Sequence, residues 1–395
     1  MKKGIYIVSR IFPNTNGGTQ HNYGLCSTIS KYVSLEVFSY IDKKNYSMGL
    51  DGEKRPFNLH FYVQDKSVNK INTKLALIND VDRHMLNAII DCIEHMHVEI
   101  VFFTIQMMGF YEILSKRYPN IRYIYVSHNV EYKNIYGDLC NYDKQNNVPL
   151  LKHYLKIIRI PLYEKKEKKA VKKSDYVFSI ANSDSDILSE KFKENREKFI
   201  LSKPQILYIS PRDKKEKNND GIDKSLLIVG NMSWFPTVAG TMWFIKNVYS
   251  KLVDTFPSLK LYVVGGNPPE DLVKCAEKYK GIIVTGFVDD LDLYYKKCDI
   301  AIVPIFEGTG AKIKVIEAVG KHIPCVISSF AAKDYKGIEK VAAIATNKES
   351  FIQQCLLLLE SISKRLEMEN ELAEYYQEYM SDDKEIKKCL DNLLI

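Results

Sequence analysis

A glycine-rich stretch in the second half of the chain combines residue types that can bind a phosphorylated ligand. The segment is Glu307-Gly-Thr-Gly-Ala-Lys-Ile-Lys-Val-Ile-Glu317, and it follows an apolar strand pattern at 300–303. Gly308, Thr309 and Gly310 are therefore expected at a strand-to-helix turn. Small residues there let an anion reach backbone N–H groups, and the helix dipole favours negative charge. An ordinary turn followed by a solvated helix is the alternative interpretation.

The charged residues after this turn favour a ligand. Lys312 and Lys314 place positive charge in the first helical turn, where the dipole alone favours acidic residues. This inversion is explained if an anion such as a diphosphate occupies the site. Glu317 follows Gly310 by about two helical turns. Its carboxylate can only accept hydrogen bonds, which suits the hydroxyl pair of a ribose.

Two segments in the first half carry further candidate residues. Gly17 and Gly18 lie in the loop after an apolar strand pattern at 5–8, and a glycine pair lets the backbone approach a ligand closely. His128 follows the strand pattern at 123–126. Because ligands bind outside the carboxyl ends of parallel strands, His128 is a candidate for the reacting centre. A structural histidine is the alternative.

Strand and helix patterns alternate along both halves of the chain. Near-continuous apolar strands are typical of parallel sheets covered on both faces. Strands are expected at 5–8, 35–40, 100–103, 123–126, 176–180, 226–229, 259–264, 282–285, 300–303 and 325–327. Helices are expected at about 20–32, 239–253, 270–279 and 311–320, and through 349–395. We therefore expect an α/β protein with two doubly wound domains that face a central cleft.

The length of 395 residues predicts two domains, because it exceeds what one ordinary core organises. The segment 210–221 is polar, charged and almost free of apolar residues, as linkers are. We expect an N-terminal domain at 1–205 and a C-terminal domain at 206–375. A final helix at 376–395 can pack back on the first domain.

The composition, 46% apolar and 27% charged, indicates a globular protein. No apolar run approaches the roughly 18–20 residues of a membrane-spanning helix, and the N-terminus leads into a strand rather than a signal peptide. A cytosolic protein is therefore expected. The 8 cysteines form no CxxC pair, which favours reduced core residues over zinc or redox chemistry. The net charge of +7 is compatible with a phosphate-bearing partner but does not require one.

A family resemblance rests on the glycine-rich stretch and its surroundings. With Pro304 before it and Ile323-Pro-Cys-Val-Ile after it, the stretch resembles the C-terminal signature of retaining GT-B glycosyltransferases. That large family includes bacterial lipid mannosyltransferases and sucrose synthases. The resemblance is strongest over 226–330 and weaker in the first half. It implies two Rossmann-like domains and sugar transfer from a nucleoside diphosphate sugar, with retention and without a metal or other cofactor.

The resemblance also implies roles for individual residues. In this family the second glutamate of a Glu-x7-Glu motif binds the ribose and the first contacts the donor sugar, which implies these roles for Glu317 and Glu307. Nine residues separate the two here, and eight positions before Glu317 stands Thr309. Lys312 lies near the arginine position of a Gly-Thr-Arg-x-Lys-x-Leu-Glu-Ala variant. His128, in a His-Asn-x-Glu segment, would face the donor sugar.

One further segment resembles the place where relatives gather the donor diphosphate. It begins with Gly230 and Asn231, in Gly-Asn-Met-Ser-Trp-Phe-Pro. The arginine and lysine common there in the family are missing, and Lys312 or Lys314 can supply the charge. Simple packing of the tryptophan and phenylalanine against the next helix is the alternative.

Backbone contacts complete the implied donor site. Gly286, Phe287 and Val288 resemble the family segment whose backbone contacts the nucleobase, with an ordinary loop as the alternative. Gly17 and Gly18 match the glycine pair that approaches the donor phosphate and the transferred sugar. Acceptor selection is expected in the loops 41–75 and 132–160.

Metal motifs are weak in this chain. Asp184-Ser-Asp186 and Asp290-Leu-Asp292 match Asp-x-Asp, but both are placed where helices begin, and aspartate is a common helix N-cap. His95-Met-His97 lacks the additional ligands that a metal site needs. We expect no metal.

The lysine-rich segment 152–173 also contains apolar residues at several positions. A basic amphipathic surface suits the face of an anionic membrane, as in glycosyltransferases that act on lipid-linked sugars. A solvated helix is the alternative.

The family resemblance implies a glycosyltransferase with a nucleoside diphosphate sugar as co-substrate and a glycan or lipid-linked acceptor, in bacterial surface polysaccharide or glycolipid synthesis. It is expected in the cytoplasm, with a possible peripheral contact to the inner face of the membrane and no nucleic-acid partner. His128 would orient the sugar, and Lys312 or Lys314 would hold the leaving diphosphate. Two alternatives share the architecture, namely a UDP-sugar epimerase and a non-catalytic binding subunit. A dinucleotide dehydrogenase is disfavoured because no Gly-x-Gly-x-x-Gly follows the predicted strands.

Overall fold

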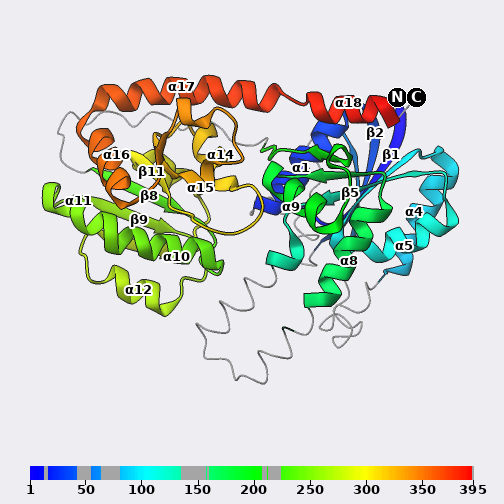
Figure 1. The fold of residues 1–395 in the computed structure, drawn as a ribbon, viewed down its shortest axis with the longest axis horizontal. Coiled ribbons are helices and arrows are strands. Elements are labelled where there is room, and N and C mark those ends of the chain that lie inside the picture. The colour runs from blue at the N-terminus through cyan, green and yellow to red at the C-terminus, as the bar shows by residue number, and fades with distance from the viewer. Residues whose placement is uncertain are drawn as a thin grey trace. The chain divides into compact units, whose positions relative to one another are not determined.

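The computed structural model divides into two compact units (Figure 1). Unit 1 comprises Met1–Leu207, Thr309–Ala311 and Asp383–Ile395, and unit 2 comprises Tyr208–Gly308 and Lys312–Asp382. The structure describes residues 1–12, 17–41, 55–63, 81–134, 157, 160–206, 211 and 224–393. Among these residues no helix has both the length and the apolar character to cross a membrane.

Unit 1 is built on a seven-stranded parallel sheet in the order β3-β2-β1-β4-β5-β6-β7. Its strands are β1 (Lys2–Arg10), β2 (Val33–Ile41), β3 (Asn58–Val63), β4 (Ile100–Thr104), β5 (Arg122–Ser127), β6 (Tyr176–Ser179) and β7 (Phe199–Leu201). Alternate residues of a strand point to opposite faces. Ile5 and Ile7 of β1 join one core cluster, whereas Tyr6 and Val8 join another. Both faces are covered, which is why the strands are apolar almost throughout.

The helices of unit 1 connect these strands. They are α1 (Gly17–Ile29), α4 (Arg83–Met96), η1 (Ile105–Met107), α5 (Met108–Arg117), α8 (Ile160–Lys173), α9 (Asn182–Phe192) and η2 (Arg196–Lys198). Helix α4 illustrates the local rules. Asp82 caps it by accepting the N–H of Met85, and Met85, Ile89 and Ile93 form one buried stripe.

The C-terminal helix α18 (Lys384–Leu393) also belongs to unit 1. It packs against β7, and Ile386 and Leu390 are buried in the same core cluster as Tyr6. Glu385 accepts a hydrogen bond from the Leu201 N–H at 3.1 Å. The chain therefore completes the core of unit 1 with a segment that follows unit 2 in sequence.

Unit 2 is built on a six-stranded parallel sheet in the order β10-β9-β8-β11-β12-β13. Its strands are β8 (Ser225–Val229), β9 (Lys260–Val264), β10 (Ile282–Gly286), β11 (Ile300–Val303), β12 (Cys325–Ser328) and β13 (Ala343–Ala345). Its helices are α10 (Phe235–Phe244), η3 (Ile245–Tyr249), α11 (Ser250–Thr255), α12 (Glu270–Ala276), α13 (Asp292–Lys297), α14 (Ile313–Gly320), α15 (Ser329–Ala332), η4 (Ile338–Lys340), α16 (Lys348–Glu360) and α17 (Ile362–Ser381).

A close backbone approach fixes the end of β11 in unit 2. A Cβ added to Gly240 of α10 would lie 1.8 Å from the carbonyl oxygen of Pro304. Only glycine allows α10 to pack this tightly against the residue that follows β11. The glycine-rich stretch therefore starts from a rigid point.

The two doubly wound α/β domains expected from the sequence are confirmed, and each predicted strand is present. Strands β3, β7 and β13 were not predicted. Each of the three stands at an edge of its sheet. The predicted helix at 20–32 begins earlier, at Gly17, and the helix at 239–253 contains a π-helical turn, η3.

Candidate functional site

The glycine-rich stretch forms the expected strand-to-helix turn between β11 and α14. Gly308 and Gly310 have φ of 105° and 74°, values that favour glycine. A Cβ on Gly308 would lie 3.2 Å from the Trp234 ring. Gly310 is buried, whereas Glu307 and Gly308 before it are exposed. An ordinary turn remains an alternative, because left-handed glycines are common in turns.

Gly310 belongs to unit 1 and is held by a buried carboxylate. Its N–H donates to both oxygens of Asp184, at 3.1 and 3.0 Å. Asp184 lies in the first turn of α9, which begins at Asn182 and has Ala181 at its N-cap. The expectation that Asp184 takes part in the N-cap is therefore wrong, because the carboxylate contacts Gly310 instead.

Glu317 is buried on α14 and is already paired. One carboxylate oxygen lies 2.5 Å from Nζ of Lys314, one turn earlier on the helix. The hydroxyl of buried Tyr295 also hydrogen bonds to Glu317, and burial, followed by this neighbour, raises the pKa of Tyr295 well above its ordinary value. Lys314 and Glu317 therefore form a preformed polar pair at the start of α14.

Lys312 precedes α14 as its N-cap residue and is buried to 4% exposure. Its ammonium lies 6.0 Å from the centre of the Trp234 ring and 5.2 Å from that of Phe330. Its carbonyl oxygen accepts a hydrogen bond from the Tyr335 hydroxyl at 2.9 Å. The helix start thus holds two cations, one over aromatic rings and one beside a carboxylate.

The loops after β8 and β10 complete the candidate residues of unit 2. A Cβ on Gly230 would lie 2.6 Å from the Thr237 side chain. Asn231 is exposed, and its side chain accepts the N–H of Ser233 at 3.0 Å. Gly286 is the last residue of β10, and Phe287 and Val288 follow it in the loop.

That second loop is open. Gly286 has φ of 71° with no atom within 4 Å of an added Cβ, and Phe287 is 72% exposed. Val288 is half-buried. The end of β10 and the start of this loop are therefore accessible from solvent.

Gly17 and Gly18 are the first residues of α1 rather than part of the preceding loop. The first turn of α1 contains no acidic residue. The backbone N–H groups of a first helical turn have no acceptors within the helix, so such a turn can donate hydrogen bonds to an anion. The glycine pair therefore offers a helix start, not the loop that the sequence predicted.

His128 follows β5 in unit 1 and hydrogen bonds to α1. Its Nε2 lies 2.8 Å from Oδ1 of Asn22. The same oxygen accepts a hydrogen bond from the Tyr6 hydroxyl at 2.8 Å, and Nδ2 of Asn22 donates to the Arg10 carbonyl at 3.0 Å. Burial lowers the pKa of His128 to about 4. The imidazole is therefore neutral at physiological pH.

A second histidine stands against the first. The ring of fully buried His21 meets that of His128 edge-on, with centroids 5.4 Å apart. Burial, and then His128, hold the pKa of His21 well below its ordinary value. Neither ring nitrogen of His21 hydrogen bonds to a described residue. The two histidines therefore form an uncharged polar pair in unit 1.

A buried glutamate fixes the chain just after His128. Glu167 of α8 accepts the N–H groups of Glu131 and Tyr132 at 2.9 and 3.1 Å. Burial raises the pKa of Glu167 to about 8, although these two N–H groups favour the carboxylate. The segment from His128 to Tyr132 is thereby anchored to α8.

Sequence reasoning missed Asn22, His21 and Glu167. His21 and Asn22 are polar residues on the buried side of α1, directly after the predicted glycine pair. Glu167 shares the buried face of α8 with Ala170 and Val171. A polar residue at an apolar position of a helix was the available signal in each case.

The lysine-rich segment is described from Ile160 onward as α8. Two of its lysines are paired, Lys169 with Glu112 at 2.6 Å and Lys172 with Glu194 at 3.4 Å. Most of 135–159, and most of the predicted acceptor loops, lie outside the described residues.

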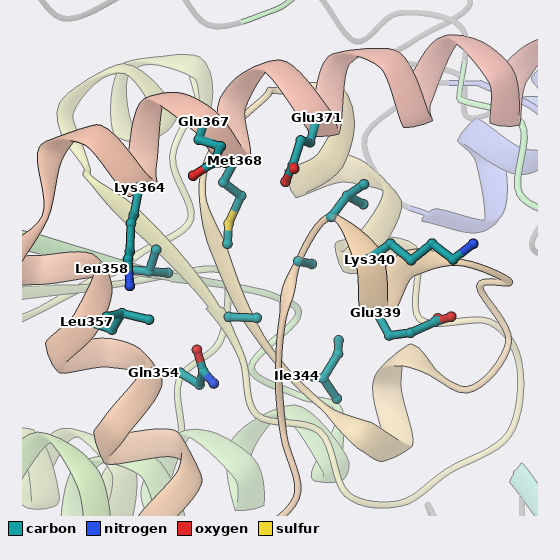
Figure 2. A pocket seen from close by; sticks show the side chains of 13 residues that line it. Glu339, Lys340, Ile344, Gln354, Leu357, Leu358, Lys364, Glu367, Met368 and Glu371 are labelled. Atoms are coloured by element: carbon teal, nitrogen blue, oxygen red, sulfur yellow. The ribbon is translucent and has the colours of Figure 1, made fainter.

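A separate pocket of about 400 Å³ lies in unit 2, away from every predicted site residue. Figure 2 shows Lys364, Met368 and Glu371 reaching into it from α17. Leu357 and Leu358 of α16 line another side. Its charged residues are mixed in sign, so its lining does not indicate one class of ligand.

The predicted Asp-x-Asp and His-x-His motifs form no metal cluster in the described part of the chain, where no three carboxylate, histidine or cysteine groups come together. Asp186 of the first motif pairs with Arg196 at 2.7 Å, and Asp292 of the second pairs with Lys321 at 2.7 Å.

One sequence comparison concerns mainly unit 2. Residues 223–361 match the family model of glycosyl transferases group 1. A curated relative, an uncharacterised 44.6 kDa protein in the cps region of Klebsiella pneumoniae, is 25% identical over 169 residues. This match covers 36% of the chain and 43% of the relative, so it spans less than half of the relative's length.

Structural comparisons cover nearly the whole chain. TarM has a TM-score of 0.69 at 10% identity, with 100% of this chain and 99% of that one covered. A glycosyltransferase from Rickettsia africae has a TM-score of 0.64 at 13% identity, with 99% and 98% covered. HepE of Anabaena in complex with UDP and glucose has a TM-score of 0.62 at 10% identity, with 99% and 100% covered. The chain therefore has the GT-B fold that the sequence resemblance implied, and its residues 223–361 match the family model of glycosyl transferases group 1.

Proposed function

We propose that this protein is a glycosyltransferase that moves a sugar from a nucleoside diphosphate sugar to an acceptor hydroxyl, with retention and without a metal. The observation that carries the proposal is the start of α14, where a glycine turn with two left-handed residues precedes the ion pair between half-buried Lys314 and buried Glu317. This arrangement lies within the part of the chain that matches the group 1 family model. It offers cations for a diphosphate and a carboxylate for a ribose.

Each predicted residue has a proposed role at the donor. The buried cation of Lys312 and the half-buried one of Lys314 attract the diphosphate, and Glu317 accepts hydrogen bonds from the ribose hydroxyls. The open loop at Gly286–Val288 contacts the nucleobase. The backbone N–H groups at the start of α1, at Gly17 and Gly18, add donors for the phosphate or the transferred sugar.

Transfer then requires stabilisation of the separating charges. The acceptor oxygen forms a bond to the anomeric carbon while the bond from that carbon to the diphosphate oxygen breaks on the same face. The leaving phosphate oxygen takes the acceptor proton. Lys312 and Lys314 stabilise the negative charge that develops on the diphosphate. His128 orients the sugar through a hydrogen bond.

Two relatives support a donor of this class. The Anabaena HepE structure contains UDP and glucose, and another of similar fold is WaaG, described as a glycosyltransferase of lipopolysaccharide biosynthesis. The curated relative is described by its place in a Klebsiella cps region. We infer a nucleotide-sugar donor and a bacterial surface glycan or glycolipid as acceptor.

Donor binding and acceptor dependence test the proposal. UDP-, GDP-, ADP- and dTDP-sugars are screened by thermal shift, because a ligand that binds the folded state raises the melting temperature. The stabilising donor is then incubated with and without acceptor oligosaccharides. Acceptor-dependent release of nucleoside diphosphate supports a transferase. Conversion of the donor sugar without acceptor supports the epimerase, and binding without any turnover supports the non-catalytic subunit.

Metal independence and stereochemistry are tested with the same assay. Activity that survives EDTA and yields a product of unchanged anomeric configuration agrees with the proposal. Loss of activity in EDTA that Mg²⁺ or Mn²⁺ restores contradicts it.

We further propose a peripheral contact between α8 and anionic membranes. Lys165 and Lys168 are exposed on this helix. Charge reversal of both is expected to reduce pelleting with vesicles of acidic lipid, and wild-type pelleting is expected to fall with salt. Reversal of Lys278 and Lys280, two exposed lysines of unit 2, serves as the matched control. Equal pelleting of both variants contradicts a role for α8.

A further inference from the structure

The amide of Asn22 has a defined orientation inside unit 1. Its Nδ2 donates to the carbonyl of Arg10 at 3.0 Å, and its Oδ1 faces the Tyr6 hydroxyl and His128 Nε2, each at 2.8 Å. The reversed amide would place Oδ1 against the Arg10 carbonyl oxygen, two acceptors with no hydrogen between them. Only the orientation with Nδ2 toward Arg10 satisfies the contacts.

This orientation determines which nitrogen of His128 carries a proton. The Oδ1 atom of Asn22 can only accept, so His128 Nε2 must donate to it. The imidazole is neutral near physiological pH because burial disfavours its charged form. A neutral imidazole carries one proton, so Nδ1 is left as an acceptor. Among the described residues, the hydrogen bond found for this ring is the one between Nε2 and Asn22.

The surroundings of the two rings resist any other protonation state. Tyr6 OH occupies the second acceptor position of Asn22 Oδ1, and both Tyr6 and Asn22 are buried. His21 stands edge-on to His128 with no charged partner of its own. Protonation of half-buried His128 at Nδ1 would place a cation next to fully buried, uncharged His21.

We propose that Asn22 is a positioning residue that locks His128 in the Nε2–H tautomer, so that His128 offers the lone pair of Nδ1 to a hydroxyl of the donor sugar. This inference rests on the proposed function, in which His128 faces the sugar. It assigns His128 the role of hydrogen-bond acceptor rather than proton donor. The sugar hydroxyl donates to Nδ1, and its own oxygen becomes a better acceptor for other groups.

The test reads the tautomer directly. Two-bond ¹H–¹⁵N correlation spectra of histidine-labelled protein, assigned with His128→Gln, are recorded without donor at about neutral pH. Wild type is expected to show the pure Nε2–H pattern for His128. Asn22→Leu, which removes the acceptor and keeps the side-chain size, is expected to show a mixture with the Nδ1–H form. Its kcat is expected to fall roughly 10- to 100-fold, as for other losses of tautomer control, with donor KM changed less than about threefold.

Two variants guard against a purely structural effect. Tyr6→Phe removes the other donor to Asn22 Oδ1 and leaves His128 Nε2 bonded, so it is expected to keep the Nε2–H tautomer. Asn22→Asp keeps an acceptor beside Nε2 and is expected to retain the tautomer even if it is less stable. If Asn22→Leu fails to fold, the proposal is supported when wild type, Tyr6→Phe and Asn22→Asp all show the Nε2–H pattern.

Three outcomes overturn it. These are an Nδ1–H or charged His128 in wild type, an unchanged tautomer in folded Asn22→Leu, or tautomer loss in Tyr6→Phe equal to that in Asn22→Leu. The spectra need no donor, so they are independent of sugar transfer. A wild type with the Nε2–H tautomer and no transfer contradicts the proposed function while leaving the positioning by Asn22 supported.

Discussion

The polar groups near His128 in unit 1 and those at the start of α14 in unit 2 are held in opposite ways. Around His128 the groups are buried and uncharged: burial lowers the pKa of both histidines, and Asn22 links His128 to Tyr6. At α14 the groups are ionic, with Lys314 2.5 Å from Glu317 and Lys312 over aromatic rings.

The difference matches the two parts of a nucleotide sugar. A hexose is neutral and is recognised by hydrogen bonds whose direction matters, so a fixed neutral imidazole suits it. A diphosphate is an anion, so cationic side chains at the start of a helix suit it. We therefore expect variants of the neutral network to affect the chemical step and variants of the ionic network to affect donor affinity.

The largest effect is expected from His128→Ala. Loss of the group that orients the sugar should lower kcat roughly 100- to 1,000-fold, whereas the dissociation constant of the donor should change less than about threefold, because the diphosphate and ribose contacts remain. Steady-state kinetics and calorimetric titration measure the two quantities. His95→Ala, an exposed histidine on α4, is the control. A loss confined to donor affinity would contradict the division between the two networks.

Glu317→Gln should act on affinity instead. A glutamine keeps the size but provides one acceptor in place of a charged carboxylate, so donor binding should weaken roughly 10- to 100-fold. Glu307→Gln is the matched variant, because Glu307 is exposed at the other end of the stretch. It should change donor affinity less than about threefold. An equal or larger loss of donor affinity in Glu307→Gln would assign to Glu307 the donor-sugar contact of the first glutamate in the Glu-x7-Glu motif, despite its different spacing.

The fold was largely predictable because its central strands are buried on both faces. Their apolar residues form continuous runs, such as those of β1 and β4, that a parallel sheet requires. Strands β7 and β13 have three residues each, and β3 is half-exposed along its length. Such edge strands depend on pairing with a neighbour rather than on their own pattern, so the sequence carried little sign of them.

The ionic part of the candidate site was more accessible from sequence than the neutral part. Lys312, Lys314 and Glu317 lie within one helical turn and a half, so spacing alone brings them together. The partners of His128, Asn22 and His21, come from α1, far away in the chain, and the fold of unit 1 brings α1 beside the end of β5. A local pattern could not have shown that Asn22 reaches His128.

The pH dependence of stability tests whether Glu167, which anchors the segment after His128, is protonated in the folded protein. The folded-state pKa of Glu167 is raised to about 8 from an ordinary 4.5, so the folded state binds more protons between these values. The stabilising contribution of protonated Glu167 is then present below about pH 4.5 and lost as pH rises through 8.

Glu167→Gln removes this titration. Relative to wild type, the variant should gain stability on the order of 2 kcal/mol as pH rises from about 5 to 8, measured by urea unfolding. Glu164→Gln, on the same helix, is the control for loss of a surface charge. The stability difference between Glu167→Gln and wild type could instead stay constant with pH or shift in favour of wild type. Either result would mean that the N–H groups of Glu131 and Tyr132 outweigh burial and keep the carboxylate charged.

The smallest expected effect is the response of donor affinity to salt. Exposed charges are screened strongly and buried pairs much less, so the donor dissociation constant of wild type should rise only about two- to fivefold between roughly 0.05 and 0.5 M NaCl. Lys314→Met should bind more weakly and flatten this dependence, because it removes the more exposed of the two cations. Lys278→Met should leave the salt dependence unchanged.

His128→Ala should also keep the wild-type salt response, since the group it removes is neutral. A salt response that vanishes in His128→Ala but persists in Lys314→Met would reverse the assignment of the two networks.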